Sequence, residues 1–221
     1  MVEPINPPAE TSEVVPLFPT CIWKTQLWAE HYEPINGKIK KKLDELRAGK
    51  PGLRPGEKWQ TDQGLHKLEE FQDLVVVIRA AARGVFDFLH IVYEDFHITG
   101  CWANISAVGT PHKTHMHPNN YLSGVYYVQI QGGADTITFE DPRPQTYVIA
   151  PGTREDTAEN LATAHLSVKE GMIVLFPAWL PHSVPANQSA GERISVAFNI
   201  MFSAFGEKMS HPQWQGNLPI D

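Results

Sequence analysis

The chain has 221 residues, of which 42% are hydrophobic and 10% aromatic, so it can bury a core and is not intrinsically disordered. Its 18 Lys and Arg against 25 Asp and Glu give a net charge of −7, which excludes a dominant role in binding nucleic acid or an anionic membrane. The N-terminus is acidic and proline-rich, unlike a signal peptide, and no apolar run is long enough for a spanning helix. We therefore expect a cytoplasmic protein with a flexible arm, residues 1–16, and a single domain, residues 17–221.

The first part of the domain carries a strand pattern followed by two helix patterns. Leu17–Trp28 mixes apolar, aromatic and threonine positions as strands do, and Pro19 restricts this strand to a sheet edge. Helices are predicted over Pro34–Ala48 and Leu68–Tyr93, with a loop over residues 51–65 between them. The second helix has an apolar stripe that predicts burial of one face, made of Phe71, Leu74, Val75, Ile78, Ala82, Val85, Phe86 and Leu89.

The second half of the chain consists of short segments rich in β-branched and aromatic residues, separated by turn signals. Such spacing is typical of a sandwich, barrel or jelly roll rather than a parallel sheet. The predicted fold class is therefore α+β, with helical support over about residues 30–93, a β core over about 97–202 and a C-terminal tail, 203–221. The tail could cover a partner subunit in a homodimer or the protein's own core. The expected strands are Ile98–Val108, Tyr121–Gln129, Asp135–Glu140, Thr146–Ala150, Leu166–Val168, Met172–Phe176 and Arg193–Phe202.

Histidines form the first candidate site. His115 and His117 are two residues apart, so on a strand both side chains point to one face, as two ligands of one metal ion must. His182 lies between two expected strands, and a jelly roll can bring strands that are distant in sequence face to face. The three predict a metal site, but imidazole suits Fe, Zn, Cu and Ni, so they do not name the metal.

Arg193 and Ser195 form the second candidate site. They share one face of an expected strand whose other face is apolar, so the apolar face can pack on a helix while Arg193 and Ser195 point into the β core. A buried guanidinium is costly without an anionic partner. That partner is either a bound anion or a glutamate such as Glu140, unless this face of the strand is solvated.

The order His-x-His, Tyr-Tyr strand, Gly-Gly, distal His and Arg-x-Ser resembles the iron(II)- and 2-oxoglutarate-dependent oxygenase superfamily. The run HMHPNNYLSGVYYV, residues 115–128, is similar to a family of oxygenases found in bacteria and phages. The resemblance covers roughly residues 97–202 and implies a double-stranded β-helix, a cupin-like jelly roll, with the helices packed on its major sheet. It also implies a dioxygenase that hydroxylates an unknown substrate and releases succinate and carbon dioxide.

The same resemblance implies a role for each matching residue. His115, His117 and His182 would hold Fe(II), and Arg193 would bind the distal carboxylate of 2-oxoglutarate. The neighbours of this cosubstrate would be Ser195, Tyr127 and Asn104, and weaker candidates for the pocket wall or substrate contacts are Asn119, Asn120, Trp102, Trp179 and Asn199.

One position departs from the superfamily, since most members have Asp or Glu where this chain has His117. Asp135 or Glu140 could supply a carboxylate, and His112 could replace His115 as a ligand. Two other functions remain open: a jelly-roll protein that holds Zn or Ni in a three-His site without redox chemistry, and a cupin-like enzyme that needs no 2-oxoglutarate. The sequence does not identify the substrate, which could be a small molecule or a peptide.

Overall fold

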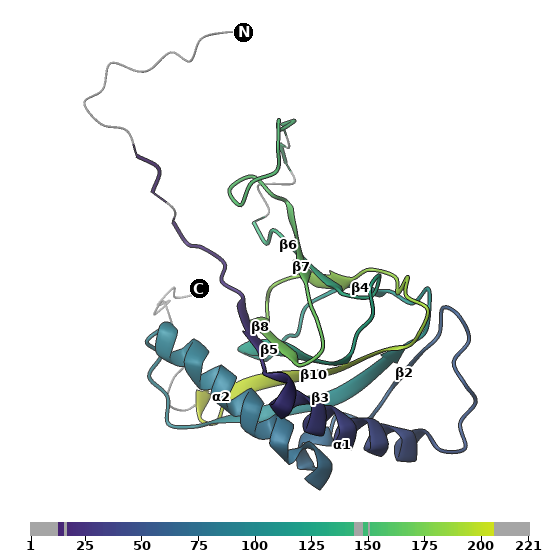
Figure 1. The fold of residues 1–221 in the computed structure, drawn as a ribbon. Coiled ribbons are helices and arrows are strands. Elements are labelled where there is room, and N and C mark those ends of the chain that lie inside the picture. The colour runs from purple at the N-terminus through teal and green to yellow at the C-terminus, as the bar shows by residue number, and fades with distance from the viewer. Residues whose placement is uncertain (1–12, 16, 144–147, 150, 206–221) are drawn as a thin grey trace, which may run out of the picture.

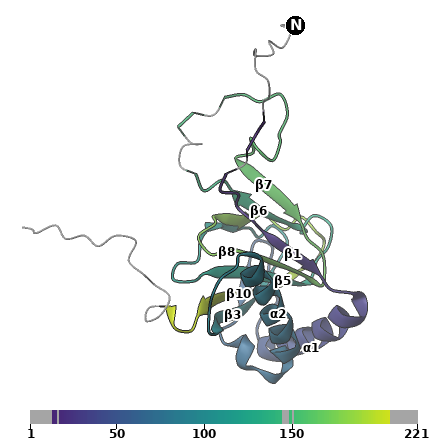
Figure 2. The ribbon, with the colours of Figure 1, turned by 90° about the vertical axis from the view of Figure 1, so that its left-hand side faces the viewer.

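The fold is seen in a computed structural model that describes residues 13–15, 17–143, 148–149 and 151–205 (Figure 1). The described chain forms three layers: a pair of helices, a six-stranded sheet and a four-stranded sheet. The helices cover one face of the six-stranded sheet and the smaller sheet lies over the other face, as the view turned by 90° shows (Figure 2). The N-terminal arm and the C-terminal tail lie largely outside the described residues, as does most of the strand expected over Thr146–Ala150.

Both sheets are antiparallel, with strand order β1-β8-β5-β10-β3-β2 in the larger and β4-β9-β6-β7 in the smaller. The larger sheet consists of β1 (Trp23–Gln26), β2 (Lys58–Gln60), β3 (Phe96–Ser106), β5 (Leu122–Gln129), β8 (Met172–Pro177) and β10 (Arg193–Phe202). The smaller consists of β4 (His112–His115), β6 (Thr136–Glu140), β7 (Thr163–Ser167) and β9 (His182–Val184). The two sheets confirm the α+β prediction with a double-stranded β-helix core.

The helices differ from their predicted limits at one end each. Helix α1 (Ala29–Arg47) begins before Pro34, which was expected to start it. Proline has no backbone N–H to donate, and the helix tolerates this loss because its buried residues pack on the sheet. Helix α2 (Gln72–Phe88) follows two 3-10 turns, η1 (Leu65–Lys67) and η2 (Glu69–Phe71). It stops short of Tyr93 because His90 adopts a left-handed backbone with φ 52°, which ends the helical path.

Three short strands were not predicted. Strand β2 lies within the expected loop at residues 51–65, while β4 and β9 contain histidines of the candidate metal site. Strands of three or four residues leave little periodicity in a sequence, which explains why they were missed. Strand β1 is shorter than Leu17–Trp28, but it is an edge strand as Pro19 indicated.

The apolar core is divided between the two faces of the larger sheet. On the helix face, the α2 stripe packs against strand residues such as Val196 and Phe198. Val75 of the stripe is half-buried and Leu89 at its end is exposed, so these two residues are less buried than predicted. A second cluster between the sheets contains Phe139 and Phe176.

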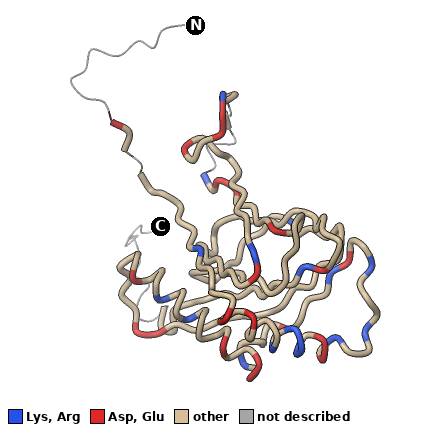
Figure 3. Tube along the Cα trace, in the orientation of Figure 1, with Lys and Arg blue, Asp and Glu red and all other residues tan. Residues whose placement is uncertain are grey.

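Charges of both signs are spread over the helices and the surface loops (Figure 3). No helix in the described part of the chain is both long and apolar enough to cross a membrane. Cys21 and Cys101 are free thiols, and burial raises the pKa of the Cys101 thiol to about 12, so this side chain behaves as a core residue rather than a nucleophile.

Candidate functional site

A cavity of about 510 Å³ opens between the two sheets, within the size range of small-molecule sites. Strands of both sheets line it, so residues far apart in the sequence meet there. Its wall contains all three predicted metal ligands together with Arg193, Ser195, Tyr127, Asn104 and Trp102.

The three predicted metal ligands converge. One nitrogen each from His115, His117 and His182 lies within 4.8 Å of the others, which is close enough for one metal ion to reach all three. His115 and His182 are register partners on neighbouring strands β4 and β9, so they lie side by side in one sheet rather than face to face on two. His117 lies beyond the end of β4, and its backbone N–H donates to the Ala178 carbonyl at 2.9 Å, which corrects the expectation that both His115 and His117 lie on a strand.

Backbone carbonyls orient two of the three imidazoles in the same way. Nδ1 of His115 lies 2.7 Å from the Lys113 carbonyl oxygen, and Nδ1 of His182 lies 2.9 Å from that of Leu180. In each case Nδ1–H can donate to a carbonyl two residues earlier, which leaves Nε2 as a lone-pair donor for a metal. The Nδ1 of His117 instead faces the side-chain amide nitrogen of Asn199 at 3.5 Å.

Burial keeps two of these imidazoles, those of His117 and His182, neutral. It lowers the pKa of His117 and of His182 to about 4, with a further contribution from the neighbouring His115. Neutral imidazoles have the free lone pair that metal binding requires. The three nitrogens therefore fit a divalent ion such as Fe(II), and they leave coordination positions for other ligands.

The other ligands considered from the sequence lie elsewhere. Glu140 accepts a hydrogen bond from the Thr114 hydroxyl at 2.6 Å, and Asp135 accepts one from the Gly133 backbone N–H at 3.2 Å. His112 lines the cavity, but its Nε2 lies 3.3 Å from the Ser106 hydroxyl and it is not in the three-His group. None of these side chains takes the place of one of the three histidines.

Next to the histidines, the cavity wall carries polar atoms without partners. Arg193 is only 3% exposed, and its Nε has no hydrogen-bond partner among the described residues. The same holds for the Tyr127 hydroxyl and for Oδ1 of Asn104. The expected alternative, an ion pair of Arg193 with Glu140, is not found in the described part of the chain. Unpaired buried donors are costly, so Arg193 Nε and the Tyr127 hydroxyl fit an anion bound in the cavity, whereas Asn104 Oδ1 would accept from a donor.

Ionisation states agree with such an anion site. Burial lowers the pKa of Arg193, partly offset by its neighbour Tyr127, yet an arginine stays charged at physiological pH. Burial also raises the pKa of Tyr127 well above its usual value, so its hydroxyl keeps the proton that it can donate. A carboxylate placed here would accept from both side chains, and Arg193 suits the two oxygens of that group.

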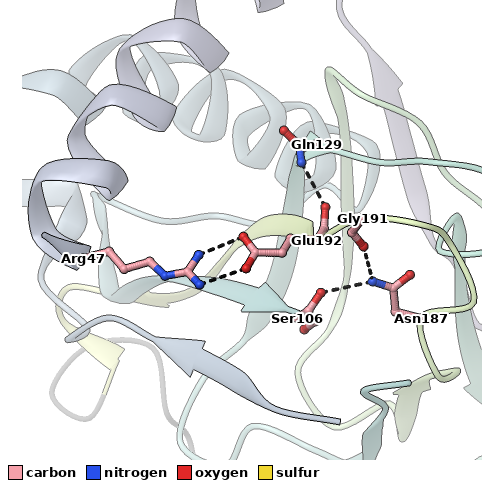
Figure 4. Close-up of polar contacts among 6 residues, drawn as sticks. All are labelled: Arg47, Ser106, Gln129, Asn187, Gly191 and Glu192. Atoms are coloured by element: carbon pink, nitrogen blue, oxygen red, sulfur yellow. Dashed lines mark hydrogen bonds and ion pairs between the residues drawn. The ribbon is translucent and has the colours of Figure 1, made fainter. Parts of the chain in front are cut away.

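The residue before Arg193 is anchored to helix α1. Glu192 forms a bidentate pair with Arg47, at 2.8 and 2.9 Å, and its backbone carbonyl accepts a hydrogen bond from the Gln129 side chain at 3.0 Å (Figure 4). Asn187 holds the preceding loop by donating to the carbonyls of Ser106 and Gly191 (Figure 4). These contacts fix the start of β10 and so the position of Arg193.

The weaker candidates are distributed over three places. Trp102 lines the cavity, with its ring centroid 6.0 Å from that of His117. Asn199 lies behind His117 and accepts a hydrogen bond from Ser123 at 2.7 Å, so it supports a ligand rather than the cavity wall. Three candidates are not among the residues that line the central cavity: Asn119, Asn120 and Trp179, the last of which borders a separate pocket of about 200 Å³.

Sequence reasoning missed several residues of the cavity wall. Lys58 and Gln60 come from β2, which lies within the loop expected over residues 51–65. Their alternation with Trp59, whose ring packs on the core of the helix side, is the signal that could have revealed a short strand. Lys113 was passed over inside the histidine motif, although it too lines the cavity.

Comparison with protein families gives one match. Residues 100–199 match the family model described as "Putative 2OG-Fe(II) oxygenase". The match confirms the resemblance to iron(II)- and 2-oxoglutarate-dependent oxygenases, while the narrower likeness of residues 115–128 to a bacterial and phage family stays a prediction. A search of curated protein sequences finds no match.

Comparison with solved structures shows the same fold. A prolyl-4-hydroxylase from Pseudomonas putida aligns with a TM-score of 0.55 at 15% identity, covering 83% of this chain and 93% of the hydroxylase. The epimerase SnoN from nogalamycin biosynthesis, described as α-ketoglutarate-dependent, gives 0.60 at 12% identity over 91% of each chain. HygX from Streptomyces hygroscopicus, solved with nickel and 2-oxoglutarate bound, gives 0.58 at 14% identity over 83% of each chain.

Proposed function

We propose that this chain, of which residues 100–199 match the model of a 2OG-Fe(II) oxygenase family, is a dioxygenase that uses Fe(II) and 2-oxoglutarate to hydroxylate a small molecule. The observation that carries the proposal is the meeting of two sites in one cavity. A cluster of three imidazoles suits the metal, and the donors of Arg193 and Tyr127, which have no partner among the described residues, suit a carboxylate beside it.

Each residue would then have a defined task. His115, His117 and His182 would hold the iron, and Arg193 with Tyr127 would bind the distal carboxylate of 2-oxoglutarate, with Ser195 beside it. Bound there, Fe(II) supplies the chemistry by which dioxygen and 2-oxoglutarate become succinate and carbon dioxide while one oxygen atom enters a substrate C–H bond. The apolar side chains of Ile137 and Phe176, which also line the cavity, would exclude water from the reacting groups.

The three-His set replaces the carboxylate ligand that most of the superfamily uses, so the iron site would carry one more positive charge. An anionic cosubstrate offsets that charge. The orientation of two imidazoles by backbone carbonyls, rather than by acidic side chains, is consistent with a site in which the cosubstrate supplies the negative charge.

A protein that only stores metal is less well supported. Such a module has no use for a guanidinium that is 3% exposed in the same cavity and has no ion pair among the described residues, because this group lowers stability unless an anion binds it. The same argument counts against a cupin-like enzyme that needs no 2-oxoglutarate.

We also propose that the chain forms a single domain and that the protein is located in the cytoplasm. The described chain from residue 17 to 205 packs around one sheet pair, which supports a single oxygenase domain over residues 17–221. The free thiols of Cys21 and Cys101 support a reducing compartment such as the cytoplasm.

Succinate release tests the activity. Wild-type protein supplied with Fe(II), 2-oxoglutarate and dioxygen should form succinate, and removal of iron by a chelator should stop it. His182→Ala should bind no iron in elemental analysis and form no succinate, whereas His31→Ala, which changes an exposed histidine of α1, should behave as wild type. The proposal fails if wild type forms no succinate and calorimetry detects no binding of 2-oxoglutarate, or if the His182 variant retains a full equivalent of iron.

A further inference from the structure

The charges on the cavity wall differ from those of the chain as a whole. The protein has a net charge of −7, yet the described residues that line the central cavity include Lys58, Lys113 and Arg193 and no Asp or Glu. A wall with only positive side chains attracts anions, and the surrounding low-dielectric protein strengthens that attraction. The proposed 2-oxoglutarate site accounts for Arg193 but not for the two lysines.

Strand register places Lys58 on the cavity face of the larger sheet. Lys58 of β2 is the register partner of Ser106 on β3, and Ser106 is the partner of Arg193 on β10. Register partners on adjacent strands point to the same face. The next row likewise joins polar side chains across four strands, namely Gln60, Asn104, Ser195 and Tyr127.

The Lys58 ammonium also acts on another residue of this wall. After burial, the charges of Arg193 and Lys58 are the next largest contributions that lower the pKa of His112, to about 4. Both cations therefore lie near the His112 ring, which lines the cavity.

Lys58 is too far from Tyr127 to belong to the same anion site. Strands β2 and β10 are separated by β3, so the Lys58 and Arg193 backbones are about 10 Å apart at roughly 4.8 Å per strand, and Tyr127 on β5 is one strand farther. Arg193 and Tyr127 suit one carboxylate at the inner end. Lys58 on the edge strand suits a second anionic group.

The two lysines are available for such a group. Across residues 17–143, 148–149 and 151–205 no ion pair of Lys58 or Lys113 is found, whereas Lys38 and Lys42 on α1 are paired with Asp73 and Glu70. Both cavity lysines are exposed, so their flexible side chains can reach a ligand at the mouth. Fe(II) and doubly charged 2-oxoglutarate cancel each other in net charge, so they do not balance the charges of the two lysines.

We propose that the substrate is a small organic anion, a carboxylate or a phosphate ester, whose charged group is bound by Lys58 and Lys113 at the mouth of the cavity. This inference rests on the proposed function and names its substrate class. A lysine is a point charge that accepts either kind of anion, so the two head groups are separated by experiment rather than by geometry.

The test measures binding to the full-length protein loaded with Fe(II) and saturated with 2-oxoglutarate, without oxygen, so that no turnover occurs. Hexanoate, hexyl phosphate and the neutral hexanamide are titrated in a calorimeter. At least one anion should bind about tenfold more tightly than the amide, an effect of the size expected for two partly exposed ion pairs. The anion that binds better identifies the head group.

Variants assign the effect to residues. Lys58→Met and Lys113→Met should each weaken the preferred anion about threefold, and the double variant should bind it no better than hexanamide. Lys24→Met is the matched control, because Lys24 lies on the opposite edge strand, β1, and outside the cavity wall, so this variant should leave all affinities unchanged. All four variants should bind 2-oxoglutarate with the same affinity as wild type.

Three results would overturn the inference: equal affinities for anions and amide, no binding of either anion at millimolar concentration, or a weaker affinity for 2-oxoglutarate in the Lys58 variant. The last would assign Lys58 to the cosubstrate. Failure of the wild type to bind 2-oxoglutarate at all would instead refute the proposed function, so the two failures are distinguishable.

Discussion

The two faces of the six-stranded sheet use the same strands for opposite purposes. On the face toward the helices, β10 contributes Ile194, Val196 and Phe198 to a closely packed apolar cluster. On the face toward the smaller sheet, the same strand contributes Arg193 and Ser195 to an open cavity with unpaired polar atoms. Successive side chains of a strand point to opposite faces of the sheet. One set of β10 residues therefore stabilises the fold, and the other set lines the ligand site.

This difference has an energetic reason. Burial of apolar side chains on the helix face lowers the free energy of the folded state, while a buried guanidinium without a partner raises it. The helix face can offset the cavity face because the two are parts of one rigid sheet. Changes on the two faces should consequently separate in experiments, with loss of stability on one and loss of binding on the other.

The largest expected effect is on the helix face. Phe86 has no exposed surface and contacts the rings of Tyr93, Phe96, Tyr121 and Phe202. Phe86→Ala should lower the free energy of unfolding by about 3–5 kcal/mol, because it removes buried surface and leaves a cavity. Urea denaturation measures this loss. The control Phe88→Ala removes a ring that is 62% exposed and should cost well under half as much, and equal losses would contradict the comparison.

Arg193→Met should have the opposite effect, a loss of ligand binding without a loss of stability. Loss of the charged hydrogen bonds should weaken binding of 2-oxoglutarate about 100-fold, while iron content stays at the wild-type level. Because no described residue pairs with this buried guanidinium, the thermal midpoint of the variant without ligand should be equal to or above that of wild type. Calorimetry and thermal denaturation measure the two effects. Arg83→Met, on the exposed side of α2, should change neither, and a large loss of stability in the Arg193 variant would show that this residue supports the fold.

A smaller effect is expected where the two faces are connected. Glu192→Gln removes the charge that pairs with Arg47 and should cost about 1 kcal/mol of unfolding free energy, since the pair is partly buried. It should also weaken 2-oxoglutarate binding two- to threefold, because Arg193 follows directly. The comparable exposed pair of Arg54 and Glu57 provides the control, and Glu57→Gln should leave the 2-oxoglutarate affinity unchanged. Unchanged affinity in both variants would exclude a positioning role for Glu192.

The smallest expected effect is on the loss of stability in acid, to which His112 contributes. The pKa of this imidazole is about 4 in the folded protein and 6.5 in the unfolded chain, so between these values the unfolded chain binds a proton that the folded protein does not. Stability is therefore lost as the pH falls from 6.5 to 4. In metal-free protein, His112→Gln should remove the part of that loss that comes from this imidazole, measured by urea denaturation at several pH values. Parallel stability curves for wild type and variant would contradict it.

Features with a long or regular pattern could be predicted from the sequence. The stripe of α2 and the alternation in β10 correctly placed Ile78 in the core and Arg193 on the inner face, because each repeats its signal over many residues. The histidine motif brought His115 and His117 together correctly, although His117 follows the strand rather than belonging to it.

Features that depend on tertiary pairing could not be predicted. Strand β2 has three residues, so its only local signal is the alternation of Lys58 and Gln60 with Trp59, and its place in the cavity wall is defined by its register with β3. The pairing of His115 with His182 depends on how β4 meets β9, and the sequence alone suggested opposite layers. The left-handed backbone of His90, which ends α2, likewise has no pattern in the surrounding residues.

The candidate metal ligands and the anion-binding residues belong to different sheets, with His115 and His182 in the smaller and Arg193 and Tyr127 in the larger. Phe176 of the larger sheet contacts the His182 ring of the smaller one, with centroids 4.5 Å apart, and belongs to the same apolar cluster as Tyr127. The separation of the two sites is therefore a property of packing, set by a side chain that bonds to neither ligand. A change in the size of the Phe176 side chain would alter how the metal site and the anion site are placed relative to each other, while each site alone would keep its affinity.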